Sequence, residues 1–275
     1  MKNISLQFII FTFSTSLWAA DFQPGAVSTA TGGAGRGTNE AVDGVLLNPA
    51  IVAAMTNKQL TLDYKPHQWG LLIADNGRDS YFPAALAFVR SDIDDVKTQQ
   101  LSLAIGYSYK KIISAGLNFS MLEYDLTAHQ LDQRYRQSVG DFGMIYSIGS
   151  GFAVGLVANK IFASKTELEP SLQKQKTVGL GGSYVFQNFL RLRFDIESDN
   201  DYQTKNVIYM GGLETFINDW MITRFGYQNN NINKKHYFTA GLGFSGPQFG
   251  LHYAYLSDVA DSSNDQHSID LGIPF

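Results

Sequence analysis

Large apolar residues alternate with small or polar residues through most of the chain, and this pattern restricts the fold more than any other feature. In 101–109 (LSLAIGYSY) every odd position is apolar or aromatic and every even position is small. Segments with the same alternation follow at 113–121, 142–148, 178–186, 238–244 and 249–255. Side chains of a strand point alternately to its two faces, so these segments predict an all-β fold whose strands have one apolar face each.

The residues on the second face indicate which kind of β-fold the chain adopts. A soluble barrel fills its core with large inward-facing side chains. Here the second face of almost every segment carries glycine, serine, alanine or charge, which cannot fill a dry core. The pattern predicts a transmembrane, antiparallel, up-and-down barrel with its large residues facing lipid. Aromatic residues make up 13% of the chain, which fits the girdles of such barrels.

Tight turns alternate with longer polar stretches, as expected for short periplasmic turns and long outer loops. The tight turns are predicted at 110–111, 149–150, 187–188, 218–219 and 246–247, and the longer connections at 92–98, 125–134, 163–174, 199–204, 229–234 and 258–265. Twelve strands follow from Tyr81 to Phe275, and a hairpin at Pro66 within 58–75 gives fourteen, the preferred number. Twelve strands, with 58–75 packed elsewhere, is the alternative.

Residues 1–20 have the features of a secretory signal peptide. Lys2 supplies the positive charge, 6–17 are predominantly apolar, and Ala19 and Ala20 are small residues suited to cleavage. The apolar run is shorter than the roughly 20 residues of a spanning helix, although an inner-membrane anchor is the alternative. We expect a mature protein in the outer membrane of a Gram-negative bacterium, with outer-membrane lipid around it.

The chain ends on an aromatic residue of an alternating strand, 267–275 (HSIDLGIPF). Ile269, Leu271, Ile273 and Phe275 share one face. This end resembles the terminal signature that outer-membrane barrels present to their assembly machinery. The resemblance implies that this machinery is a partner that binds through Phe275.

Several functions are disfavoured by what the chain lacks. It has no cysteine, so disulfides, thiolate metal sites and a cysteine nucleophile are excluded. A net charge of −4 gives no case for nucleic-acid binding. No nucleophile elbow or metal-ligand spacing is present, and the five histidines are scattered. We expect neither an enzyme, nor a cofactor, nor a metal site.

Residues 21–57 differ from the rest, because they are rich in small residues and do not alternate. The elements Phe22-Gln23, Gly35-Arg36, Ala41-Val42-Asp43 and Asn48-Pro49-Ala50 resemble the N-terminal hatch of the long-chain fatty-acid transporter family (FadL/TodX type). Barrels of the PorV type, which serve protein secretion, carry a similar pairing of Gly-Arg with Asn-Pro-Ala. The resemblance implies fourteen strands, 58–275, around a plug, 21–57, that includes Gly35, Arg36, Asn48, Pro49 and Ala50.

Two further interpretations of this segment are a flexible periplasmic tail and a phosphate-binding loop. The run 32–37 (GGAGRG) lacks the Gly-Lys-Ser/Thr sequence and the strand–helix context of such a loop. The family resemblance implies passive uptake of hydrophobic or amphipathic small molecules, such as long-chain fatty acids, which enter from outside and leave through a gap in the wall. The alternative is a structural or secretion-accessory barrel that binds protein partners.

Charged residues of the barrel strands fall on the face opposite the large apolar residues. In 190–197 (LRLRFDIE) the alternation places Arg191 and Arg193 in the lumen with Asp195 and Glu197. Glu214, Arg224, Asp141, His252 and Asp270 are inward on other strands by the same argument. A charge facing lipid at mid-depth costs about 2–4 kcal/mol. These groups either form salt bridges that brace wall and plug, or Arg191, Arg193 and Arg224, with Glu214, bind a substrate carboxylate.

Overall fold

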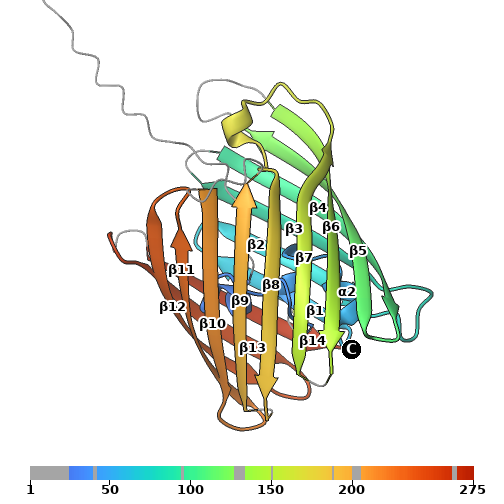
Figure 1. Cartoon of the computed structure of the whole chain (residues 1–275). Helices are drawn as coiled ribbons and strands as arrows, with labels where there is room; N and C mark the ends of the chain where they lie inside the picture. Colours follow the sequence, from blue (N-terminus) through green and yellow to red (C-terminus); the bar gives the residue numbers. More distant parts are fainter. Residues whose placement is uncertain are drawn as a thin grey trace, which may run out of the picture.

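Fourteen antiparallel strands form a closed barrel in the computed structural model of the chain, within the residues that the structure describes (Figure 1). These residues are 25–39, 42–93, 96–126, 134–149, 151–187, 189–199, 206–261 and 265–275. The strands are β1 (Gln59–Lys65), β2 (Gln68–Asp75), β3 (Ala84–Ile93), β4 (Val96–Tyr109), β5 (Ile113–Asp125), β6 (Arg134–Ile148), β7 (Phe152–Ala163), β8 (Thr177–Phe186), β9 (Leu190–Asp199), β10 (Val207–Phe216), β11 (Met221–Asn230), β12 (Lys235–Ser245), β13 (Gly250–Asp258) and β14 (Gln266–Pro274). Each strand pairs with its sequence neighbours, and β1 pairs with β14, so the sheet has no free edge.

The strand number confirms the fourteen-stranded prediction. Lys65 pairs with Gln68, so β1 and β2 form the hairpin that was expected at Pro66. His67 follows Pro66 with a φ of 63°, the left-handed conformation that closes this turn. The twelve-stranded alternative is therefore wrong. The signal-peptide prediction, 1–20, lies outside the described residues.

One predicted loop is instead a strand extension. Asp92 pairs with Lys97 and Ile93 with Val96, so only residues 94 and 95 join β3 to β4. The prediction of a long polar connection at 92–98 is wrong because polar residues there continue both strands. Polarity marks the end of the apolar surface and not the end of the strand. The described residues of the five predicted tight turns lie between strands, at one end of the barrel.

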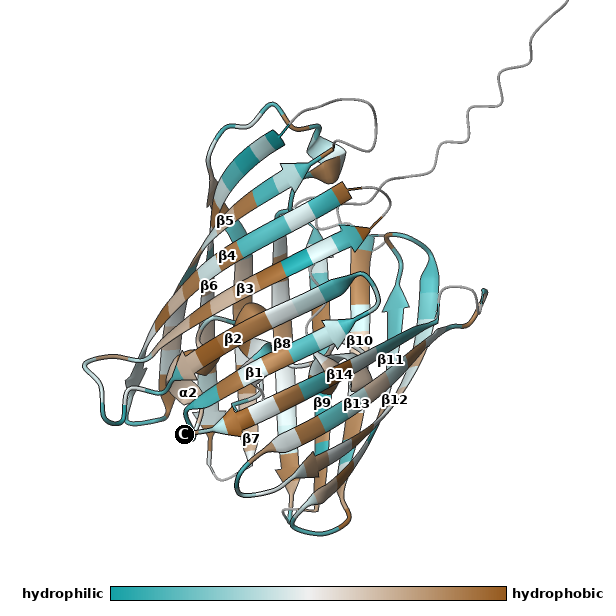
Figure 2. Cartoon of the chain, turned by 180° about the vertical axis from the view of Figure 1, so that it is seen from behind, coloured by the Kyte–Doolittle hydropathy of each residue, from teal (hydrophilic) through white to brown (hydrophobic). Residues whose placement is uncertain are grey.

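The two faces of the strands differ as the alternation predicts. Leu103, Leu180 and Phe225 are 46%, 52% and 59% exposed on the outer surface, whereas Ser102 and Ala104 are buried in the lumen. Figure 2 shows hydrophobic and more hydrophilic residues following one another along the strands. An apolar outer surface on a closed barrel is stable only against hydrocarbon, so the fold is that of a transmembrane barrel.

Residues 25–39 and 42–57, which precede β1, lie inside the barrel, where Figure 1 shows them in blue. They contain α1 (Ala26–Ala30), η1 (Val42–Leu46) and α2 (Ile51–Ala54). We call residues 25–57 the hatch. Its α1 contacts β11, β12, β13 and β14, whereas α2 contacts β3, β4 and β5. The hatch therefore follows the inner wall from β14 back to β3 before the chain enters β1.

Inward-facing glycines let the hatch backbone approach the wall closely. At each of them a Cβ atom would lie within 3.0 Å of a hatch atom, a distance that real Cβ atoms essentially never show. These glycines are Gly106, Gly116, Gly143, Gly155, Gly179, Gly181, Gly212, Gly226 and Gly241. The hatch therefore packs on the small face of the strands. We call these nine glycines the glycine belt.

Apolar side chains also hold the hatch against the wall on one side of the lumen. Val45, Ile51 and Val52 of the hatch pack in a buried cluster with wall residues that include Leu72 and Ile145. Full burial of a valine or isoleucine contributes about 1.5–3 kcal/mol. The hatch is therefore held by ordinary core packing on this side.

A pair of adjacent glycines on β8 tests the glycine belt. A Cβ at Gly181 would meet Asp195, Arg36 and the backbone nitrogen of Gly37, all within 3.0 Å, whereas at Gly182 the nearest atom is 3.9 Å away. We expect Gly181→Ala to lower the free energy of unfolding by about 1–3 kcal/mol, the usual result of overpacking. Gly182→Ala is the matched control and should have little effect.

The measurement is the urea unfolding midpoint of the full chain in detergent micelles. Equal midpoints for the two variants would contradict close seating of the hatch on the wall.

Candidate ligand site in the barrel lumen

The lumen contains a buried ion cluster on three consecutive strands. Glu214 of β10 lies directly opposite Arg191 of β9 and Arg224 of β11. Its carboxylate accepts from Arg191 Nη1 at 3.2 Å, from Arg193 Nε at 2.8 Å and from Arg224 Nε at 2.8 Å. All four residues are at most 5% exposed. The structure therefore brings together all four residues of the predicted site.

This cluster carries more positive than negative charge. Three guanidinium groups share the single carboxylate of Glu214. Arg193 also donates to the carbonyl of Ala34 in the hatch, at 3.5 Å, and Arg191 lies over the ring of Phe216. The excess positive charge suits an additional anionic group, which charge-assisted hydrogen bonds would hold.

A second ion cluster ties the hatch to β9. The Asp195 carboxylate accepts the backbone N–H groups of Gly35, at 2.8 Å, and Arg36, at 2.9 Å, together with Arg36 Nη1 at 3.2 Å. Arg36 also pairs with Glu197. Asp195 is fully buried, so its charge is stabilised by these donors. This cluster has the geometry of a salt bridge that braces the wall and the hatch, which is the first of the two interpretations of the lumen charges.

The two halves of the hatch motif contact each other. Asn48 Nδ2 donates to the carbonyl of Arg36 at 2.7 Å, and Asn48 Oδ1 accepts the N–H of Ala50 at 3.0 Å. The second bond closes an Asx turn around Pro49. Gly143 and Gly116 of the wall lie against Asn48 and Pro49. Gly35, Arg36, Asn48, Pro49 and Ala50 thus form one connected hatch core.

A cavity of about 220 Å³ lies next to the ion cluster of Glu214. Its lining includes Phe216, Ile222, Ser245 and Gly246, which flank the short turns. The cavity is therefore at the short-turn end of the lumen. Val27, Asp43 and Asn57 supply its hatch side.

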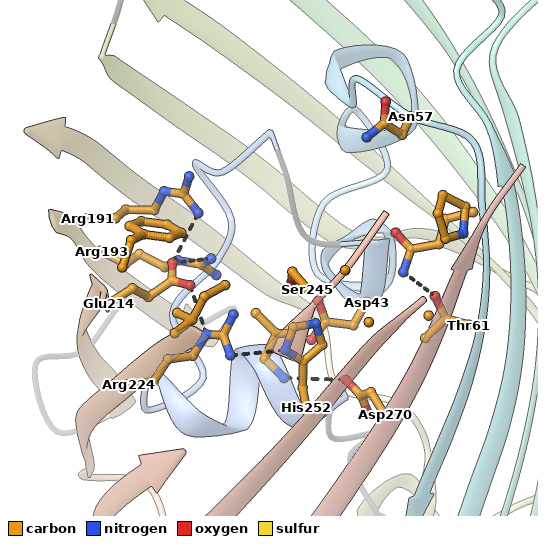
Figure 3. A pocket seen from close by; sticks show the side chains of 18 residues that line it. Asp43, Asn57, Thr61, Arg191, Arg193, Glu214, Arg224, Ser245, His252 and Asp270 are labelled. Carbon is orange, nitrogen blue, oxygen red and sulfur yellow. Dashed lines mark hydrogen bonds and ion pairs between the residues drawn. The ribbon is translucent and has the colours of Figure 1, made fainter. Parts of the chain in front are cut away.

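Figure 3 shows opposite charges on two sides of this cavity. Arg191, Arg193 and Arg224 lie on one side with Glu214, and Asp43 and Asp270 lie on the other. His252 lies between them, with Nδ1 3.3 Å from Arg224 Nη1. The sequence places His252 and Asp270 in the lumen, but it gives no sign that they share a cavity with Asp43.

An apolar cluster lies at the other end of the lumen, near the long connections. Leu168 and Leu172, between β7 and β8, are buried against Val96 of β4, Leu122 of β5 and Val139 of β6. We call this set the outer cluster. Leu168 and Leu172 were not among the predicted lumen residues, because they stand in a polar connection. Two leucines four residues apart, the second in the short helix η3 (Pro170–Leu172), were the available signal.

The wall is least regular between β6, β7 and β8. The β7–β8 pairing ends at Ala158 and Val178, and a bulge opposite β6 follows, with Lys160 at a φ of 53°. Within the bulge, Asn159 Nδ2 donates to Thr177 Oγ1 at 2.9 Å. In the described residues all adjacent strands are paired, so the wall has no open gap here. We call this irregular stretch beyond Ala158 and Val178 the β7–β8 seam.

Among the described residues, no helix has the length and the apolar character of a membrane-spanning helix. The same residues contain no group of three histidine, aspartate or glutamate side chains that could hold a metal ion.

Several solved structures are similar to this chain in fold, whereas no protein-family model and no curated protein matches it. CymD, a monoaromatic hydrocarbon channel, is 13% identical, with a TM-score of 0.61 over 91% of this chain and 96% of that one. The Ralstonia pickettii toluene transporter TbuX is 11% identical, with a TM-score of 0.61 over 91% and 97%. A Pseudomonas aeruginosa FadL homologue is 10% identical, with a TM-score of 0.60 over 92% and 98%.

These likenesses and the lumen define the class of protein structurally, as a fourteen-stranded transmembrane barrel with an internal hatch. At such identities the likeness establishes a shared fold. The resemblance of the hatch motif and the fold likeness agree, because each leads independently to the same architecture.

The Glu214 cluster gives a stability test. Replacing Glu214 by glutamine keeps its shape but leaves three buried guanidinium groups without their counter-charge, which we expect to cost about 3–5 kcal/mol. Glu123→Gln is the control, since Glu123 pairs with the exposed Arg136 and should contribute no more than about 1 kcal/mol. Urea unfolding in detergent measures both. A similar small loss in both variants would argue against the cluster as a structural element.

Proposed function

We propose that the protein is an outer-membrane channel for passive uptake of hydrophobic or amphipathic small molecules, such as long-chain fatty acids. We also propose that it belongs to the long-chain fatty-acid transporter family. The apolar outer surface supports the membrane location, and the hatch motif and fold likeness support the family. The outer cluster is the observation that carries the proposed uptake.

The outer cluster offers an apolar entry site above the hatch. Leu168 and Leu172 come from a connection that is outside the barrel strands, so they can move without breaking strand pairing. Displacing them would expose an apolar surface of Val96, Leu122 and Val139 to an incoming substrate. Burial of a substrate's hydrocarbon there contributes about 0.8 kcal/mol per methylene group.

The ion cluster of Glu214 is the proposed site for the polar end of an amphipathic substrate. Arg191, Arg193 and Arg224, with Glu214 as their internal counter-charge, would bind a carboxylate group. The hatch core lies between this cluster and the outer cluster along the barrel. Passage therefore requires the hatch to shift, or the substrate to leave through the wall near the β7–β8 seam.

A second candidate function is a structural or secretion-accessory barrel that binds protein partners. It is favoured by the unbroken strand pairing and by the ion pairs that fasten the hatch. A barrel of this type needs no route through its lumen. The two candidates differ in whether loss of the protein slows uptake.

Uptake of a radiolabelled long-chain fatty acid by cells with and without the protein tests the proposal. We expect the deletion strain to lose uptake and the restored gene to recover it. The double variant Leu122→Asn/Val139→Asn should lower the rate about tenfold or more, because it replaces two apolar contacts of the surface that the substrate would meet. Leu180→Asn, which changes a leucine on the outer wall, controls for general effects on the barrel.

Folded, correctly located variants are required for comparison, and the outer-membrane level of each variant is measured in parallel. Unchanged uptake of the fatty acid and of toluene in the deletion strain would refute the channel proposal and leave the accessory role.

A further inference from the structure

The carboxylates of the lumen cavity are only partly used by the hatch. Asp43 Oδ2 accepts the N–H of Ser28 at 2.9 Å, and Asp270 Oδ2 accepts the N–H of Ala26 at 2.6 Å. Each of these bonds holds α1 in place. Both residues also line the cavity, and they are 5% and 2% exposed.

The second oxygen of each carboxylate has no hydrogen-bond partner among the described residues. Both Asp43 Oδ1 and Asp270 Oδ1 are buried in this way. An unpaired buried carboxylate oxygen is costly. A cationic or N–H donor group in the cavity would satisfy both oxygens.

The opposite side of the cavity has an excess of positive charge. There, three guanidinium groups share the carboxylate of Glu214, so an added anionic group gains charge-assisted hydrogen bonds. The cavity therefore has a cationic side, from β9, β10 and β11, and an anionic side, from the hatch and β14 (Figure 3).

We propose that this cavity binds a small zwitterion, with its carboxylate on Arg191, Arg193 and Arg224 and its ammonium group on Asp43 and Asp270. The inference rests on the carboxylate site proposed above, and it adds the second charge of the ligand. A plain carboxylate leaves the aspartate oxygens unpaired, and a plain amine leaves the excess guanidinium charge uncompensated. Lys65 of β1 also acts electrostatically on these two aspartates, but the second oxygen of each still has no hydrogen-bond partner among the described residues, so a ligand with both charges satisfies both sides.

The experiment is calorimetric titration of the full chain in detergent with matched ligands. The zwitterions are glycine, 4-aminobutanoate and 6-aminohexanoate, which differ in charge separation. Hexanoate and hexylamine have the same six-carbon chain as the longest zwitterion but only one charge. We expect at least one zwitterion to bind about tenfold more tightly than both single-charge ligands, since each lost charged contact costs about that factor.

Two variants locate the bound ligand. Asp43→Asn keeps an oxygen for the Ser28 N–H but removes the charge, so it should reduce the zwitterion's advantage over hexanoate about tenfold. Arg191→Gln should weaken both zwitterion and hexanoate. Glu123→Gln, on an exposed ion pair of β5, is the control that should change neither.

The ligand series with the unaltered protein decides the proposal even if a variant fails to fold. Equal binding of hexanoate and the best zwitterion would overturn it and leave a simple carboxylate site. Equal binding of hexylamine and the best zwitterion, or no binding of any zwitterion, would also overturn the proposal. Loss of the uptake function in cells has no bearing on these titrations, so the two proposals fail separately.

Discussion

In this closed sheet, large apolar side chains occupy the outer face and charged side chains occupy the inner face. The rest of the structure depends on this constraint. Hydrocarbon outside the barrel accepts leucine and phenylalanine but not charge. Successive side chains of a strand point to opposite faces, so every side chain that does not face lipid faces the lumen. In this chain the other face carries mainly glycine, serine and ionised groups, which leave a lumen wide enough for the hatch.

The hatch and the wall satisfy each other's requirements. A compact segment with little regular structure needs partners for its backbone N–H groups, and Asp195 and Asp270 of the wall supply carboxylate oxygens for them. In return, the segment fills space that glycine side chains leave open. Close backbone contact and buried ion pairs thus replace the large apolar core of a soluble barrel. The same buried charges give the lumen its two oppositely charged sides.

Much of this architecture was predictable because it depends on local periodicity. The twelve strands from β3 to β14 and the inward placement of Arg191, Arg193, Arg224 and Glu214 follow from alternation, which each strand shows by itself. Alternation left the hairpin at Pro66 as one of two alternatives. The failure at 92–98 has a related cause, since polarity cannot distinguish a loop from a strand that extends beyond the bilayer.

The contacts that depend on long-range register were not predictable from alternation. The shared cavity of Asp43 and Asp270 and the burial of Leu168 against β4, β5 and β6 are examples, because nothing in a single strand specifies its partners across the lumen. Single-cysteine nitroxide scanning of 101–104 on β4, in lipid vesicles, tests the central claim directly, and the chain has no native cysteine to remove. We expect high collision rates with oxygen, which concentrates in hydrocarbon, at positions 101 and 103, and low rates at 102 and 104. Reversed phases, or a period near 3.6, would contradict the account.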